Sequence, residues 1–301
     1  MYEIMDFIKV VKINIKTIFK NTVLLTNCIF SILAIILSFI TWEELGVNKI
    51  QNRINILVGI ILISIILSII YISLLKKTNT IWQNGGRKIT LCYGDIMKVA
   101  FPRRNKKNRI VVIPVNTSFD TIVDEDITSV DKPLISPISL HGQWIKRILK
   151  SSKTLEQLDK DIEEQFNNKN IIPTHNLSPQ EKSRGKTSCY KRGTVISIKG
   201  ENNIIYFLFA LSEFDSANNA QCSKEELYES IESLLDYYNK HSQGYELFVP
   251  LMGTNLSRVG ISHQESINIL KNIFVLHSDK INGAVNIIAY NKDKDKVSIC
   301  N

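Results

Sequence analysis

Two long uncharged segments constrain the fold of this chain most strongly. Residues 22–41 and 54–75 are apolar and contain no charged residue. Each has about the length that crosses a hydrocarbon core of roughly 30 Å, at about 1.5 Å of rise per residue. Core helices of soluble proteins rarely stay uncharged so long, and a cleaved signal peptide is not followed so soon by a second span. We therefore expect a transmembrane helical hairpin over residues 22–75.

The charges beside these segments predict their orientation. Residues 42–53 carry both acidic and basic side chains, whereas the outer flanks are basic: Lys9, Lys12, Lys16 and Lys20 on one side, Lys76, Lys77, Arg87 and Lys88 on the other. The positive-inside rule then predicts a multi-pass protein of a bacterial cell membrane with both termini in the cytoplasm. Residues 1–21 read as an amphipathic helix, which either lies on the membrane surface or extends the first span.

After residue 75 the pattern changes to alternating strands and helices. Strands are expected at 88–93, 109–115, 194–199, 204–211, 245–250 and 284–290, and helices from near His141 and over 154–166, 223–241 and 262–275. The polar stretch 167–192 reads as a long loop or lid. This alternation predicts an α/β domain over residues 85–301, with a parallel or mixed sheet covered by helices.

Residue spacing and missing motifs argue against several classes of site. The five cysteines are scattered, and their spacing to histidine does not match a zinc motif, so we expect no metal and no cofactor. Phosphate-binding P-loop, dinucleotide G-x-G-x-x-G and hydrolase G-x-S-x-G motifs are absent. The net charge is +8, and residues 98–109 are basic without an acid. That run is either a solvated loop or a contact for anionic lipid, and nucleic acid is a less favoured partner.

Three strand-end loops remain as candidate ligand contacts. Gly94-Asp95 follows the first strand, and Asn116 ends the second and leads toward a helix start at 139–145. The third loop contains Gly253 and Gly260 and enters a helix whose Ser262 and Glu265 match a capping box. Ligands of open α/β sheets bind at such strand ends, and two helix N-termini suit a diphosphate.

These loops carry a resemblance to a known family. Gly-Asp-Ile at 94–96, V-x-x-x-N ending at Asn116, and Pro-Leu-Met-Gly-Thr at 250–254 followed by Gly260 resemble the macro domain, a module that binds ADP-ribose. The resemblance implies a macro-domain-like mixed sheet flanked by helices. With the membrane hairpin, the chain resembles the membrane-anchored effectors of type II Thoeris antiphage defence.

That resemblance implies roles for particular residues. Asp95 would accept a hydrogen bond from the adenine amino group beside the Ile96 backbone, and Asn116 would face the distal ribose. Residues 253–258 would wrap the diphosphate, and Tyr290 would pack against adenine. The full set of expected ligand contacts is Asp95, Ile96, Asn116, Ser139, Leu140, His141, Gly142, Gln143, Gly253, Thr254, Asn255, Leu256, Ser257, Arg258 and Tyr290.

One departure from ordinary macro domains bears on activity. Their glycine-rich first loop is replaced here by residues 139–145, which contain His141 and Trp144 and a single glycine. This favours a pocket for an extra group on the ribose over hydrolysis, so we expect no catalytic residue.

The expected partners follow from the Thoeris resemblance. They are a histidine-ADP-ribose-type signal made by a TIR-domain enzyme, membrane lipid and further copies of the chain, with membrane damage and abortive infection as the outcome. A membrane-tethered ADP-ribosyl hydrolase, or a membrane scaffold acting through residues 98–109, remains as an alternative.

Overall fold

The computed structural model describes residues 2–104, 107–126, 128–130, 133–214, 220–254 and 259–300. The chain forms two compact units, one of residues 1–79 with 294–301 and one of residues 80–293. The sequence division at residue 85 lies close to this boundary. It leaves the segment 294–301 in the α/β domain, however, whereas the contacts assign that segment to the helical unit.

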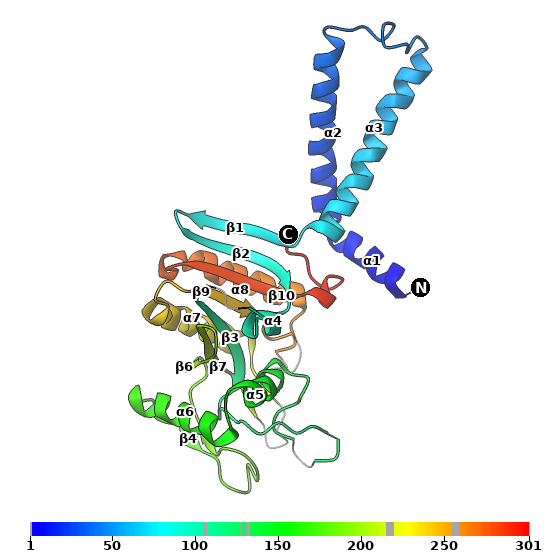
Figure 1. The fold of residues 1–301 in the computed structure, drawn as a ribbon. Helices are drawn as coiled ribbons and strands as arrows, with labels where there is room; N and C mark the ends of the chain where they lie inside the picture. The colour runs from blue at the N-terminus through cyan, green and yellow to red at the C-terminus, as the bar shows by residue number, and fades with distance from the viewer. Residues whose placement is uncertain are drawn as a thin grey trace. The chain divides into compact units, whose positions relative to one another are not determined.

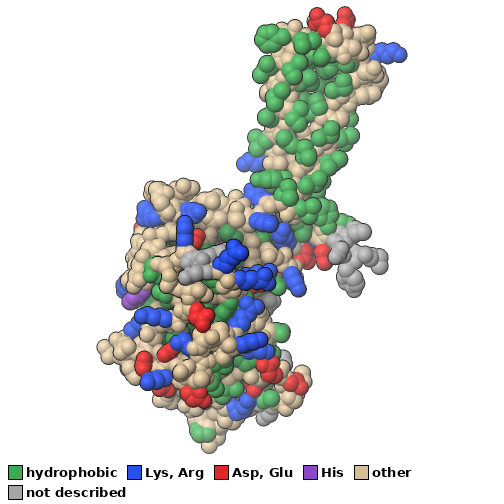
Figure 2. Space-filling view, in the orientation of Figure 1, with side chains coloured by type: hydrophobic (Ala, Val, Ile, Leu, Met, Phe, Trp, Pro, Cys, Tyr) green, Lys and Arg blue, Asp and Glu red, His purple; other side chains and the backbone are tan. Residues whose placement is uncertain are grey.

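The first unit contains the two apolar segments as helices. It consists of α1 (Tyr2–Ile13), α2 (Ile15–Leu37), α3 (Ile50–Ile70) and the π-helix η1 (Tyr71–Leu75). Ile15–Leu37 and Ile50–Leu75 are long and apolar enough to cross a membrane. In the apolar stretch of the first helix no residue is buried, and in that of the second helix 22% are buried. The core helix of a soluble protein would be mostly buried. Figure 2 shows apolar side chains covering this hairpin.

Polar side chains mark two positions in the helical unit. The first helix ends before Asn14 and the second begins after it. The Asn14 side-chain amide donates to Val10 O (2.8 Å) and accepts from Ser298 Oγ (2.6 Å). The single helix expected over residues 1–21 is therefore two helices, and Lys16 and Lys20 belong to α2. Further along, Asn21 Nδ2 donates to Ser68 Oγ (3.0 Å), which ties α2 to α3.

The second unit is built on a mixed sheet, as the sequence predicts. Its strands follow the order β1-β2-β10-β9-β3-β7-β6, with β8 paired to β7. β2, β10, β9, β3 and β7 are parallel, and β6 and β8 are antiparallel to β7. The bounds are β1 (Thr78–Asn84), β2 (Arg87–Gly94), β3 (Arg109–Asn116), β6 (Val195–Lys199), β7 (Ile204–Phe214), β8 (Ala220–Gln221), β9 (Glu246–Pro250) and β10 (Ala284–Tyr290). A separate short hairpin pairs β4 (His175–Asn176) with β5 (Ser188–Cys189).

Helices flank this sheet in two groups (Figure 1). α4 (Ile96–Ala100) and α5 (Leu140–Ser151) contact each other and β3, and α6 (Leu155–Asn168) contacts β6. α7 (Lys224–His241) and α8 (His263–Leu276) contact each other, with α7 on β7 and α8 on β10. The 3-10 turns η2 (Ser278–Lys280) and η3 (Asn291–Asp293) complete the unit. α4 and β1 are too short or too polar to have been predicted from the sequence.

The helix starts follow their capping residues. Thr154 and Ser223 each form a complete capping box, with Gln157 and Glu226. Ser262 caps α8 by accepting from Glu265 N (3.1 Å), but the Glu265 carboxylate pairs with Lys224 Nζ (2.6 Å) instead of reaching back. The capping box predicted at α8 is therefore only half formed, because a cross-helix ion pair competes for Glu265.

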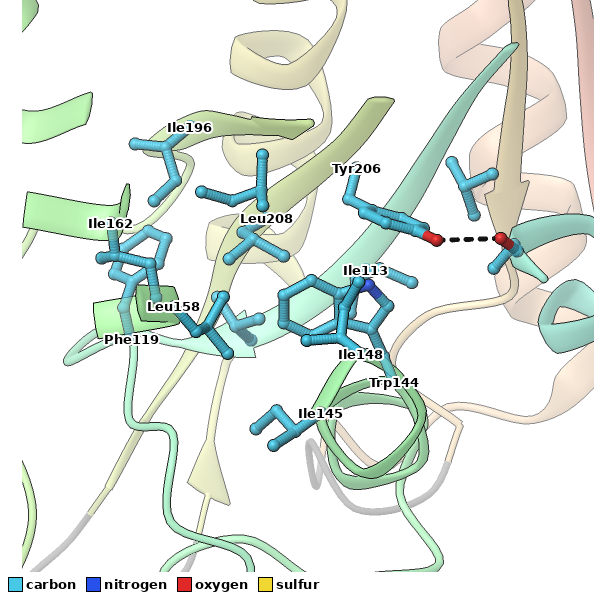
Figure 3. Packing of buried hydrophobic residues seen from close by; sticks show 14 of the residues in the cluster. Ile113, Phe119, Trp144, Ile145, Ile148, Leu158, Ile162, Ile196, Tyr206 and Leu208 are labelled. Atoms are coloured by element: carbon cyan, nitrogen blue, oxygen red, sulfur yellow. Dashed lines mark hydrogen bonds between the residues drawn. The ribbon is translucent and has the colours of Figure 1, made fainter. Parts of the chain in front are cut away.

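One large core cluster lies between β3, β6, β7 and the helices α5 and α6 (Figure 3). Trp144 of α5 is fully buried and meets Tyr206 of β7 edge to face, with ring centroids 5.4 Å apart. Burying a side chain of this size stabilises the fold by about 1.5–3 kcal/mol. The sequence predicts that the stretch that contains Trp144 shapes a ligand pocket. The Trp144 side chain itself packs on the sheet face of α5 and fills the core.

Candidate functional site

Parallel strands bring the predicted loops to one edge of the sheet. In the register of the sheet, Tyr290 lies beside Gly94, and Ile288 of the same strand lies beside Pro250. Asn116 pairs with Ser212 across a bulge at Val115/Asn116, a feature that re-aims side chains at sheet edges. The carboxyl ends of β2, β10, β9 and β3 therefore adjoin one another. This is the place where open α/β sheets bind ligands.

Asp95 caps a helix at this edge. One of its carboxylate oxygens, Oδ1, accepts from Met97 N (2.9 Å) and so fixes the start of α4. Only one carboxylate oxygen is used by the cap, so Oδ2 is available to a second donor. Ile96 packs its side chain into the core, which leaves its backbone as the part that faces the edge. The carboxylate expected to accept from adenine is thus held in place by the fold.

Asn116 is held by a buried network. Its side chain is 4% exposed, its Nδ2 donates to Asp120 Oδ2 (2.8 Å), and its Oδ1 accepts from Asp120 N (3.0 Å). Asp120 also accepts from Lys182 Nζ (2.6 Å) and from Lys186 N (2.7 Å). Asp120 therefore fixes the orientation of the Asn116 amide, which keeps one further N–H and one further lone pair for another contact.

The segment predicted as a loop or lid, residues 167–192, is joined to this network by ion pairs. We call residues 174–189 the strap. Lys182 in the strap pairs with Asp120, Arg184 pairs with both carboxylate oxygens of Asp124 (2.7 and 3.2 Å), and Lys186 pairs with Asp159 (2.6 Å). The Arg184 hydrogen bonds hold the pKa of Asp124 below its usual range.

Sequence reasoning missed the strap contacts. The partners lie in three separate segments, and each charge alone looks like an ordinary loop residue. The structure therefore adds Asp120 and Lys182 to the site.

The start of α5 is closely packed and hydrogen-bonded. Ser139 caps the helix by accepting from Gly142 N (2.9 Å), and Gln143 Nε2 donates to Ile138 O (2.8 Å). A Cβ on Gly142 would lie 2.2 Å from Ser136 O, so only glycine fits there. Leu140 opens the helix and is partly buried. Residues 139–145 thus form the cap and the first turns of a packed helix, in contrast with the flexible glycine-rich loop that they replace.

His141 is buried beside this loop. It is 7% exposed, and burial, with a further contribution from Lys186, lowers its pKa to about 3. A neutral imidazole is therefore the form present at physiological pH. Its role as a ligand contact stays a prediction.

The second glycine-containing loop follows β9. Gly253 (φ +80°) and Gly260 (φ +75°) adopt the left-handed region that favours glycine. The start of the loop is fixed to α8, because Met252 N donates to Ser266 Oγ (3.1 Å), which in turn donates to Met252 O (2.6 Å). Thr254 is half-buried. Four of the residues predicted to wrap a diphosphate, Asn255, Leu256, Ser257 and Arg258, lie outside the described residues.

Tyr290 ends β10 at the same edge and is 45% exposed. Its neighbour in the sheet is Gly94, next to Asp95. Of the positions expected to contact adenine, Asp95, Ile96 and Tyr290 thus come together. The side chain is accessible enough to pack against a flat ring.

Comparisons with known proteins place the chain in a family. Residues 89–290 match the model of the "Thoeris protein ThsA, Macro domain" family. The chain is 30% identical over 268 residues to Thoeris protein ThsA of Bacillus amyloliquefaciens (strain Y2), covering 87% of this chain and 81% of that protein.

Among solved structures, the Oceanobacillus iheyensis macrodomain with ADP is 12% identical, with a TM-score of 0.44, over 73% of this chain and 93% of that one. The same macrodomain with MES bound is 13% identical, with a TM-score of 0.43, over 72% and 92%.

The matched span covers most of the α/β unit and includes every loop at the carboxyl edge of the sheet. The curated relative extends the likeness over most of the chain. The predicted resemblance is confirmed, and this chain belongs to the ThsA macro-domain family of Thoeris defence.

Proposed function

We propose that this protein is a membrane-anchored receptor and effector. Its macro domain binds an ADP-ribose derivative of the histidine-ADP-ribose class, made by a partner enzyme with a TIR domain. Ligand binding then drives several copies to disrupt the bacterial membrane through α2 and α3, which causes abortive infection. The observation that carries the proposal is that Asp95, Tyr290 and the residues that follow β9, Met252 and Gly253, lie at one carboxyl edge.

Each part of that edge suits one part of an ADP-ribose. The free Asp95 oxygen would accept from the adenine amino group, and Tyr290 would cover the adenine ring. The loop after Gly253 leads into the N-terminus of α8, where backbone N–H groups and the helix dipole favour a phosphate. The strap residues Lys182 and Lys186, which contact Asp120 beside Asn116, would lie near the distal ribose of the ligand.

Two features support binding without hydrolysis. Asp120 fixes the orientation of the Asn116 amide, and the first turn of α5 is packed so closely that a Cβ on Gly142 would meet Ser136 O. Positioning a water for attack needs a polar group free to hold it. We therefore expect the ligand to be released without being hydrolysed.

The helical unit supplies the effector half of the proposal. Its apolar side chains are exposed over both long helices, as lipid contact requires. A ligand shifts an equilibrium only through its differential affinity for two states, so the ligand-bound macro domain would have to favour contact between copies. Both termini would lie in the cytoplasm, with the loop between α2 and α3 outside.

Calorimetric titration of the full chain in detergent tests the receptor half. Wild type is expected to bind histidine-ADP-ribose, which chromatography recovers intact. Asp95→Asn keeps the helix cap, because Asn caps as well as Asp, but it replaces the free oxygen with an NH₂ donor. Losing one charge-assisted hydrogen bond of about 1.5–3 kcal/mol predicts a drop in affinity of roughly 10-fold or more.

Asp126→Asn is the matched control, because Asp126 accepts from the backbone N–H two residues on, at Thr128, as Asp95 does at Met97, and it is not among the expected ligand contacts. It is expected to bind like wild type. Equal affinity of wild type and Asp95→Asn for the ligand, or no binding at all, contradicts the proposal that this domain is the receptor. Recovery of cleaved ligand supports the membrane-tethered hydrolase instead.

A further inference from the structure

Three side chains with metal-binding atoms meet near the end of β7. They are His175 of β4 (Figure 1), Cys189 of β5 and Glu213 of β7, and their ligand atoms all lie within 4.8 Å of one another. The β4–β5 pairing places His175 directly opposite Cys189, and His175 Nε2 lies 3.4 Å from Glu213 Oε1. The sequence predicted no metal site, because these residues are far apart along the chain.

The hydrogen bonds around His175 fix its tautomer. Thr174 Oγ1 donates its proton to Cys189 O (2.9 Å), so it accepts from His175 Nδ1–H (3.2 Å). A neutral His175 then turns the bare lone pair of Nε2 toward the carboxylate of Glu213. Two acceptors that face each other repel unless a cation lies between them. The geometry thus calls for a proton or a metal ion at this point.

The surroundings of Glu213 orient it for such an ion. Arg192 pairs with Glu213 Oε2 (3.1 Å), which leaves Oε1 for the cluster, and Arg192 is itself neutralised by Glu226. Metal-binding carboxylates and imidazoles are commonly held by such outer hydrogen bonds. Cys189 Sγ is buried and lies 3.4 Å from Ser118 Oγ.

We propose that His175, Cys189 and Glu213 bind one zinc ion, with the fourth position open to water. Imidazole nitrogen, thiolate sulfur and carboxylate oxygen are the donors that zinc takes. The thiolate and the carboxylate supply two negative charges that balance a divalent cation. Tetrahedral zinc needs donors about 3.3–3.8 Å apart, so side-chain rotations of about 1 Å close the cluster. The half-exposed His175 ring gives the ion a route from solvent.

Zinc at this position would join the strap to the sheet. His175 and Cys189 lie at the two ends of the strap, and Glu213 lies on β7, which pairs with β3 next to Asn116. The ion would hold both ends of the strap against that edge, while Lys182 holds its middle through Asp120. This inference is independent of the identity of the nucleotide ligand.

Metal titration of the full chain in detergent tests the site. After chelation and dialysis, we expect zinc to bind at one ion per chain, measured by elemental mass spectrometry and by competition with a chromophoric chelator. Cobalt(II) is expected to give a thiolate-to-cobalt charge-transfer band. Cys189→Ser should remove that band, and Cys189→Ser and His175→Ala should each weaken zinc at least about 100-fold.

Matched controls come from the same chain. Cys222→Ser changes another buried cysteine, and His277→Ala changes a histidine paired with Glu232 without a nearby thiol, so both should bind zinc like wild type. Absence of the cobalt band in wild type overturns the proposal and leaves an ordinary His175–Glu213 ion pair. Unchanged zinc affinity in His175→Ala, an exposed position that tolerates substitution, overturns it equally.

Discussion

Replacing Lys182 with Met tests whether the strap is held by its buried ion pair. Lys182 and Asp120 have side chains only 1% and 0% exposed, with Nζ 2.6 Å from Oδ2. Removing one partner of a buried pair costs about 3–5 kcal/mol, because the remaining charge stays buried without compensation. Asp120 keeps two donors, Asn116 Nδ2 and Lys186 N, which places the expected loss near the lower end, at about 3 kcal/mol.

Denaturant unfolding of the full chain in detergent, followed by tryptophan fluorescence, measures this loss. Trp144 is buried in the core of the same unit and reports on its unfolding. Lys146→Met is the matched control, since Lys146 pairs with Glu125 at a similar distance (2.7 Å) but on the surface. Exposed pairs contribute about 0–1 kcal/mol, so this variant should unfold nearly like wild type.

The double variant Lys182→Met with Asp120→Asn separates charge from packing. With both charges gone, it should lose less stability than the sum of the two single variants. A Lys182→Met protein as stable as Lys146→Met would refute the reasoning, because the pair would then hold nothing.

Three further changes have defined outcomes. His141 has a pKa of 6.5 when unfolded and about 3 when folded. Its contribution to the free energy of unfolding is therefore fully present above pH 6.5 and falls by about 1.4 kcal/mol per pH unit as the pH drops from 6.5 toward 3. His141→Gln should flatten this slope when unfolding is measured as a function of pH. Gly142→Ala should lower the melting temperature by overpacking against Ser136 O, at a cost of about 1–3 kcal/mol, whereas Gly86→Ala, with open space around it, should not. Asn21→Val should lose the bond to Ser68 and weaken α2–α3 association by about 0.6 kcal/mol in a membrane-helix association assay.

Much of the fold follows from local patterns. The uninterrupted apolar run of β3 predicts a strand buried on both faces, and all four residues Ile110–Ile113 are fully buried. Thr154 and Ser223 cap their helices, and the strand ends gather the predicted loops because parallel strands share one carboxyl edge. These features depend on neighbours in sequence or on strand direction, so a single sequence suffices for them.

The remaining features depend on contacts between distant residues. Trp144 lies in a stretch that was expected to shape a pocket, yet the face of α5 on which it lies makes it pack on Tyr206. Glu265 fits a capping box until Lys224, from another helix, competes for it. The pairing of Lys182 with Asp120 joins segments that carry no shared pattern. Such choices are made by tertiary packing, which local propensity does not encode.

Ligand-triggered leakage of vesicles tests the central claim most directly, because it joins the site to the membrane helices. The full chain would be reconstituted into dye-loaded vesicles of bacterial lipid, with histidine-ADP-ribose added outside. We predict dye release with wild type and Asp126→Asn, and little release with Asp95→Asn at the same ligand concentration. Release that is independent of ligand, or no release from wild type at a concentration that saturates binding, would contradict the claim that the macro domain controls the membrane hairpin.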